Sequence, residues 1–165
     1  MSGSNSGWQL RHSVVLMRVF IGWHFLYEGV IKIYNPEWTS YGYLASAQGP
    51  FRPFFVWLSQ DPMLTWADTL NWVALMFVGI ALLLGVFERA GAAVGAVMLL
   101  LYYLAHPSFP WLPQVNVEGS YWFVNKNLIE MAACLVIYQM PTSASFGLKY
   151  IFNRRDKEAQ AETSS

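Results

Sequence analysis

Long apolar stretches separated by short polar breaks dominate the chain. The first stretch runs from His12 to Ile33 and would form a helix about 33 Å long, enough to cross a bilayer. Further apolar stretches run from Thr69 to Phe87, from Ala90 to Ala105 and from Tyr121 to Met140. The pattern predicts an all-α fold, an integral membrane four-helix bundle.

The segments outside these stretches divide the chain into three parts. Residues 1–11 are rich in serine, glycine and asparagine, and we expect a flexible cytoplasmic N-terminus there. Residues 12–141 form the predicted transmembrane domain, which Pro141 closes. Residues 142–165 are mostly charged or small, and this composition predicts a solvated cytoplasmic tail.

The long segment between the first two predicted helices, from Tyr34 to Asp68, is too apolar to lie in water. Short helices are predicted after Ser40, as the capping residue, and from Arg52 onward. Aromatic side chains gather where the bilayer core meets the headgroups, and amphipathic helices lie in that plane. We therefore expect an amphipathic aromatic cap on the periplasmic side. Its aromatic residues are Trp38, Tyr41, Tyr43, Phe51, Phe54, Phe55, Trp57 and Trp66.

Composition supports a membrane protein and excludes several other classes. Hydrophobic residues make up 55% of the chain and charged residues 12%, about half the charged share of a soluble domain. The formal net charge is zero, so nothing indicates a nucleic-acid partner. A single cysteine, Cys134, excludes an internal disulfide framework and dithiol redox chemistry.

Lysine and arginine residues flank the predicted helices unequally. Six lie on one side and one, Arg52, lies in the first loop on the other side. Because cytoplasmic flanks are enriched in these residues, the distribution predicts that both termini are cytoplasmic and that the protein lies in an inner membrane. The six are Arg11, Arg89, Lys149, Arg154, Arg155 and Lys157.

Two polar stripes run along the first and last predicted helices. A charged residue at the bilayer centre costs about 2.5–3.5 kcal/mol and usually faces a bundle interior or a cavity. By helical geometry, the polar residues of the first helix share an arc of about 120° and those of the last an arc of about 100°. The stripes are Arg18, His24, Glu28 and Lys32 on the first helix, and Lys126, Asn127, Glu130 and Cys134 on the last.

Apart from Arg18, the charged members of both stripes are predicted to lie in the outer half of the membrane, which favours a polar pocket under the aromatic cap. Glu28 and Glu130 are candidate catalytic residues because a carboxylate can carry protons. The remaining candidates would bind the ligand: His24, Tyr27, Lys32, Trp38, Lys126 and Asn127. The alternative interpretation is an ion-pair network that only fixes the register of the helices.

Other positions suggest structural roles. Arg18, in the inner half, would reach the cytoplasmic headgroups or Glu88. Gly91 and Gly95 form a GxxxG step, which allows close helix packing within the bundle or, less favoured, in a homo-oligomer. The three histidines are scattered and no phosphate-binding loop occurs, so we expect neither a metal nor haem.

Several motifs resemble the DoxX/DoxD family, most closely its DoxD branch, the small subunit of thiosulfate:quinone oxidoreductase. The distinctive ones are RVFIGWHFLYEGVIK at 18–32 and VNKNLIE at 124–130. Weaker ones are NPEWTSYGYL at 35–44, GPF at 49–51, GIALLLGVFER at 79–89 and LYYLA at 101–105. The motif positions carried over are Arg18, Glu28, Gly29, Lys32, Asn127 and Glu130.

The resemblance implies a bacterial or archaeal four-helix membrane protein that passes electrons to quinone together with a separate redox subunit. Quinone is then the expected ligand, and the electron donor stays open. The alternative function is a non-enzymatic scaffold or accessory subunit of a larger membrane complex. A small-solute carrier is disfavoured, because no pair of broken helices in inverted halves is evident.

Overall fold

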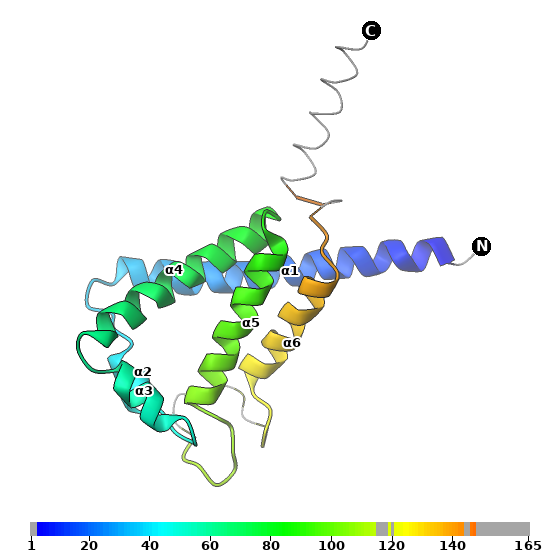
Figure 1. Cartoon of the computed structure of the whole chain (residues 1–165). Helices are drawn as coiled ribbons and strands as arrows, with labels where there is room; N and C mark the ends of the chain where they lie inside the picture. Colours follow the sequence, from blue (N-terminus) through cyan, green and yellow to red (C-terminus); the bar gives the residue numbers. More distant parts are fainter. Residues whose placement is uncertain (1–2, 115–118, 120, 144–145, 148–165) are drawn as a thin grey trace.

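The computed structural model describes residues 3–114, 119, 121–143 and 146–147, and the side chains from residue 7 onward. Within this part, the regular structure is helical, apart from one isolated backbone pairing between Tyr121 and Val124 (Figure 1). The helices are α1 (Gly3–Tyr34), α2 (Tyr41–Ala45), α3 (Arg52–Leu58), α4 (Met63–Leu84), α5 (Glu88–Ala105) and α6 (Lys126–Gln139).

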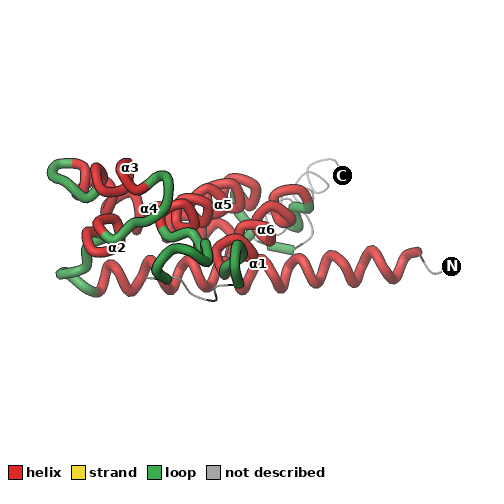
Figure 2. The backbone as a smooth tube through the Cα atoms, turned by 90° about the horizontal axis from the view of Figure 1, so that it is seen from below, coloured by secondary structure: helices red, strands yellow, loops and turns green. Residues whose placement is uncertain are grey.

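The long helices pack as two pairs. α4 returns antiparallel along α1, and α5 runs beside α6 (Figure 1). The second pair lies across the first, with α4 contacting α5 and α1 contacting α6 (Figures 1 and 2). The four long helices therefore meet around a common centre, while α2 and α3 lie to one side of the α1–α4 pair, near the C-terminal end of α1 (Figures 1 and 2).

Glycines bring α1 and α4 unusually close together. A methyl group added at Gly79 would lie 2.6 Å from the backbone nitrogen of Leu26. A methyl group at Gly22 would lie 2.9 Å from the backbone nitrogen of Leu83, and one at Gly29 would lie 3.0 Å from the sulfur of Met76. The absence of side chains at these positions lets the two backbones touch over several turns.

A tight turn joins α4 to α5. Gly85 ends α4 in the left-handed conformation with φ 66°, which a residue without a Cβ adopts without strain. Two residues separate Gly85 from the start of α5, whose Gly91 packs against Ala81 of α4. Gly95 lies beside Val78 of α4 and against the first and last helices. The GxxxG step therefore serves packing within the chain, as the sequence favoured.

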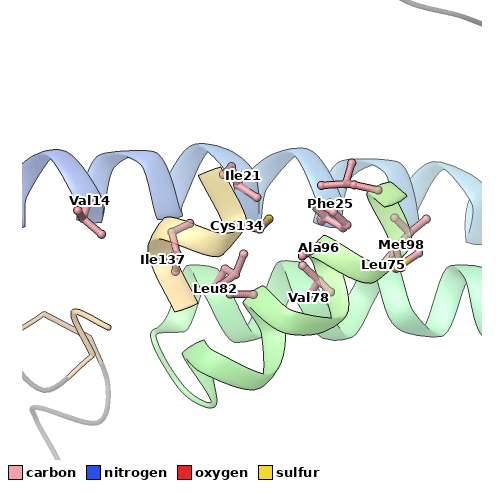
Figure 3. Packing of buried hydrophobic residues seen from close by; sticks show 12 residues of the cluster. Val14, Ile21, Phe25, Leu75, Val78, Leu82, Ala96, Met98, Cys134 and Ile137 are labelled. Carbon is pink, nitrogen blue, oxygen red and sulfur yellow. The ribbon is translucent and has the colours of Figure 1, made fainter. Parts of the chain in front are cut away.

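The main hydrophobic core fills the crossing of the two helix pairs (Figure 3). Phe25 of α1 and Leu82 of α4 meet small residues of α5 there, and Cys134 of α6 is fully buried. Cys134 thus behaves as a packing residue. The core comprises Val14, Ile21, Phe25, Leu75, Val78, Leu82, Ala92, Ala96, Met98, Leu99, Cys134 and Ile137.

Three of the described helices are long and apolar enough to cross a membrane: Gly7–Tyr34, Met63–Leu84 and Glu88–Ala105. Their outward faces carry large exposed hydrophobic side chains, including Phe20, Leu70 and Val97. Apolar surface of this extent on a monomer indicates an apolar environment. Together, the length, hydropathy and exposure of these helices indicate contact with a lipid bilayer.

The last helix is shorter than the predicted stretch Tyr121–Met140. Asn125 caps α6, and its side chain accepts a hydrogen bond from the backbone nitrogen of Leu128 at 3.2 Å. The residues before Asn125 form a tight turn instead of a helix. With 14 residues, α6 is about 21 Å long, short of a hydrocarbon core of about 30 Å. A fourth span stays a prediction.

The first helix begins at Gly3, well before the predicted start at His12. Contacts on its early turns accompany this extension: His12 Nδ1 lies 2.7 Å from the carbonyl oxygen of Trp8, and both rings pack against Phe146. Thr142, which the sequence assigned to the tail, is buried. The remaining tail, at 144–145 and 148–165, lies outside the described residues.

The segment between α1 and α4 folds as predicted into two short helices, α2 and α3. A second hydrophobic cluster, built on Leu44, Ala47, Phe55 and Ala105, packs them against the end of α5. Three polar contacts strengthen this junction. The Gln48 backbone nitrogen donates to Ala105 at 2.7 Å, Tyr43 donates to the Tyr102 carbonyl at 3.1 Å, and His106 Nε2 lies 2.9 Å from the Tyr43 carbonyl.

Ser40 precedes α2 as predicted, but its hydroxyl does not cap the helix. Both its hydroxyl and its backbone nitrogen donate to Oδ1 of Asp68 on α4, the latter at 2.8 Å. A charged acceptor strengthens such bonds to about 1.5–3 kcal/mol each. We therefore expect Asp68→Ala to destabilise the protein by about 2 kcal/mol, as measured by unfolding in detergent. Asp61→Ala, at an exposed loop position, is the control and should leave stability nearly unchanged.

Candidate functional site

A cavity of about 300 Å³ opens between the helix pairs and the α1–α4 connection. This volume lies at the lower end of the range typical of small-molecule sites. Every long helix contributes to its wall, and the connection supplies the rest. The lining residues are His24, Phe25, Glu28, Lys32, Trp38, Thr39, Ser40, Tyr43, Asn71, Leu75, Leu99, Tyr102, Lys126 and Asn127.

One ion pair lies on α1 at the edge of the cavity. Lys32 Nζ contacts Glu28 Oε2 at 2.8 Å, with the acid one turn before the base as the sequence predicted. The ammonium group also lies 5.2 Å from the ring centroid of Trp38, close enough for a cation–π contact. The Lys32 side chain is 14% exposed and that of Glu28 is 44% exposed, so the carboxylate faces the open side.

A second pair joins α1 to α6. His24 Nδ1 lies 2.7 Å from Glu130 Oε1, and the carboxylate side chain is only 11% exposed. A protonated imidazole makes this contact a salt bridge, and a neutral ring makes it a hydrogen bond to a carboxylate. The two predicted acids are therefore not in contact with each other, and each has its own basic partner.

The His24–Glu130 pair separates the cavity from an apolar groove. This groove, of about 700 Å³, runs between α1 and α6 and is lined by Glu130 and by Leu16, Phe20 and Ile129 among others. His24 and Lys126 line both hollows. The His24–Glu130 pair thus lies between the cavity and the groove.

Three of the remaining predicted ligand-binding residues line the cavity, and one does not. Trp38, Lys126 and Asn127 line the cavity. Tyr27, in contrast, is 54% exposed on α1 and is not part of the lining. The roles of all these residues in ligand binding stay predictions.

The polar lining residues that were not predicted from the sequence as ligand-binding include Asn71 of α4 and Tyr102 of α5. Asn71 Nδ2 donates to the Tyr102 hydroxyl at 2.8 Å, which links α4 of one helix pair to α5 of the other. Both lie on mainly apolar helices, where the sequence analysis identified no polar stripe. The LYYLA run containing Tyr102 reads as ordinary membrane-helix sequence, and only the fold brings the two together.

Tyr43, on α2, forms part of the cavity roof. Burial raises the pKa of its hydroxyl above the ordinary value, and the neighbouring Tyr102 hydroxyl adds to this effect. Tyr43 is therefore a neutral donor at physiological pH, which preserves its hydrogen bond to the carbonyl oxygen of Tyr102. This bond ties the roof of the cavity to the wall formed by α5.

Arg18 belongs to a separate network away from the cavity. Its Nη1 lies 3.5 Å from Glu88 Oε2 and donates to the Thr142 hydroxyl at 2.9 Å. Glu88, at the start of α5, also accepts from Thr142 and from the Ser143 backbone nitrogen. The sequence predicted that Arg18 reaches either the cytoplasmic headgroups or Glu88, and the structure shows the contact with Glu88. Gly29, the other structural candidate of α1, packs against Met76.

Within the described residues, no group of three histidine, cysteine, aspartate or glutamate side chains converges as a metal site. The expected independence from metal and haem stays a prediction. What the cavity does offer is a small chamber lined by apolar side chains, by neutral hydroxyl and amide groups, by the Glu28–Lys32 pair and by His24.

Comparison with known protein families gives a match. A family model described as DoxX matches residues 13–107, more than half of the chain. The matched region includes α4 and α5, most of α1, and the α2–α3 connection. No curated protein and no solved structure matches the chain.

Proposed function

Because the chain belongs to the DoxX family of membrane proteins, we propose that it is the membrane subunit of a quinone-linked oxidoreductase of the thiosulfate:quinone type. The observation that carries the proposal is the lining of one cavity by the Glu28–Lys32 pair and by His24, the partner of Glu130. Quinone reduction consumes protons together with electrons. A quinone site in a membrane therefore needs apolar walls, donors for the ring oxygens and ionisable groups beside them.

The lining supplies each of these elements. Phe25, Leu75 and Leu99 provide apolar surface for a ring. Lys32 can donate to a ring oxygen, and so can His24 through Nε2 when its ring is protonated. In the proposed site, Glu28 carries protons from the open side and Glu130 supports His24 as its proton partner. These assignments give the predicted catalytic role to the two acids and the predicted binding role to the bases.

The proposal includes an orientation in the membrane. Exposed aromatic side chains on α2, α3 and the start of α4, such as Tyr41, Trp57 and Trp66, suit an interfacial cap. The unequal distribution of lysine and arginine favours a periplasmic cap, cytoplasmic termini and a bacterial or archaeal inner membrane. In this arrangement α6 is the fourth span of the bundle, and a separate subunit, the partner of this chain, delivers the electrons.

Substituting the two acids tests the proposal. We expect Glu28→Gln and Glu130→Gln each to weaken binding of a water-soluble quinone analogue at least tenfold, equivalent to about 1.4 kcal/mol, because the paired base loses its anion and reorients. Equilibrium dialysis of the protein in nanodiscs measures the affinity. Glu37→Gln is the matched control, since Glu37 is exposed and does not line the cavity.

Lipid extraction of the purified protein provides an independent measurement. Quinone recovered from the wild-type protein supports the proposal, as does its reduced recovery from the two cavity variants. The proposal is wrong if no quinone co-purifies and both variants bind the analogue as the wild type does.

A non-enzymatic scaffold is the second candidate function. The observation that favours it is the Arg18–Glu88 network, in which this chain uses a buried ion pair only to join its own segments. The cavity pairs would then have the same purpose. In that case the Glu28→Leu, Lys32→Leu double variant would still assemble with its partner subunit and the wild-type complex would reduce no quinone.

A further inference from the structure

We propose that Tyr102 and Asn71 form a carbonyl-binding end of the cavity, with Tyr102 contacting the ligand and Asn71 positioning it. The quinone identity of the ligand rests on the proposed function. The pair comes from the two helices that contribute no charged residue to the cavity wall, α4 and α5. It thus lies on different helices from the paired acids and bases of α1 and α6.

The hydrogen bond between the two side chains leaves hydrogen-bonding capacity unused. With Asn71 Nδ2 donating to Tyr102 at 2.8 Å, the tyrosine oxygen is an acceptor and its own hydrogen needs another acceptor. Among the described residues, no such acceptor lies within hydrogen-bond distance of that hydroxyl, and the buried Asn71 Oδ1 also has no partner there.

The conclusion does not depend on which way the amide is turned. If the oxygen and nitrogen of Asn71 are exchanged, Tyr102 donates to the amide oxygen and the buried NH₂ group has no acceptor among the described residues. In either orientation at least one O–H or N–H hydrogen is left to donate. A buried donor without an acceptor is unfavourable, so a ligand that brings an acceptor is favoured.

The other lining residues indicate which chemical group of a ligand would accept the hydrogen bond from Tyr102. Phe25, Leu75 and Leu99, which line the same cavity, suit a flat apolar ring. A neutral donor on helices that contribute no charged residue to the wall suits a carbonyl oxygen better than a carboxylate or phosphate. Lys32 and Lys126, on other helices, can receive a second ring oxygen. The geometry thus favours a cyclic dicarbonyl held at both ends.

Tyr102→Phe tests this inference, because it removes only the hydroxyl. We expect quinone affinity to fall about five- to twentyfold, or about 1–1.8 kcal/mol, and Asn71→Leu to reduce it less. Tyr103→Phe is the matched control. It removes a hydroxyl from the adjacent residue, where it donates to the Phe123 carbonyl at 2.8 Å outside the cavity.

Infrared difference spectroscopy separates ligand contact from a structural effect. A hydrogen bond from Tyr102 lowers the stretching frequency of one of the two ring carbonyls, so that band should return toward the free value in Tyr102→Phe and stay shifted in Tyr103→Phe. If the wild type binds quinone but its carbonyl bands are the same in both variants, the inference is wrong and the proposed function stands. If the wild type binds no quinone, both are overturned.

Discussion

Replacing Arg18 with methionine should lower the free energy of unfolding by about 3–5 kcal/mol, because it leaves the Glu88 carboxylate buried without its cation. The side chains of Arg18 and Glu88 are 3% and 1% exposed, so water cannot compensate for the loss. Three donors, the backbone nitrogens of Thr142 and Ser143 and the Thr142 hydroxyl, would still reach the carboxylate. They orient it but do not neutralise it.

Denaturant unfolding in detergent measures this effect, and the double variant Arg18→Met, Glu88→Gln identifies its cause. Removing both charges should recover part of the loss, because the remaining groups are neutral. Arg52→Met, at an exposed arginine of α3, is the control and should change stability by less than about 1 kcal/mol. An equally small change for Arg18→Met would show that the ion pair contributes nothing to the stability of the fold.

Gly79→Ala is expected to have the second large effect, a loss of about 1–3 kcal/mol through overpacking. The added methyl group would lie 2.6 Å from the backbone nitrogen and 2.7 Å from the Cα of Leu26. Both are backbone atoms, so the contact cannot be relieved by a change of rotamer, and α1 and α4 would have to separate.

Gly42→Ala is the matched control, because no atom lies within 4 Å of the position of its added methyl group. Both glycines are helical, so both substitutions bring the same small gain in helix propensity. Thermal unfolding in detergent should therefore show a lower midpoint for Gly79→Ala than for Gly42→Ala. Equal midpoints would contradict the close approach of α1 and α4.

The apolar pattern predicted the end of a long helix correctly where the apolar stretch and the helical conformation end at the same residue. α5 ends at Ala105 as expected, because His106 leaves the helical conformation before Pro107. The prediction failed at the start of α6. The residues from Tyr121 to Val124, three of them aromatic, are as apolar as the membrane helices, but a tight turn with Trp122 at φ 63° and the Asn125 cap postpone the start of the helix to Lys126. Hydropathy does not detect turns or side-chain caps of this kind.

The polar residues were predictable only in part, for a related reason. Helical periodicity correctly grouped Glu28 with Lys32, because both lie on one helix. It could not tell that Glu130 pairs with His24, since that contact depends on how α6 crosses α1. Asn71 and Tyr102 gave no signal, because they lie on separate, mainly apolar helices and only the α4–α5 packing brings them together.

The attachment of the α2–α3 segment has a consequence for access to the cavity. Hydrogen bonds to Ala105 and to the Tyr102 carbonyl fasten this segment to the end of α5. The roof of the cavity and its α5 wall are consequently joined, so that moving the α2–α3 segment away from α5 would break these bonds. On α1, in contrast, the Glu28 side chain is 44% exposed, so its carboxylate can be reached from outside the chain.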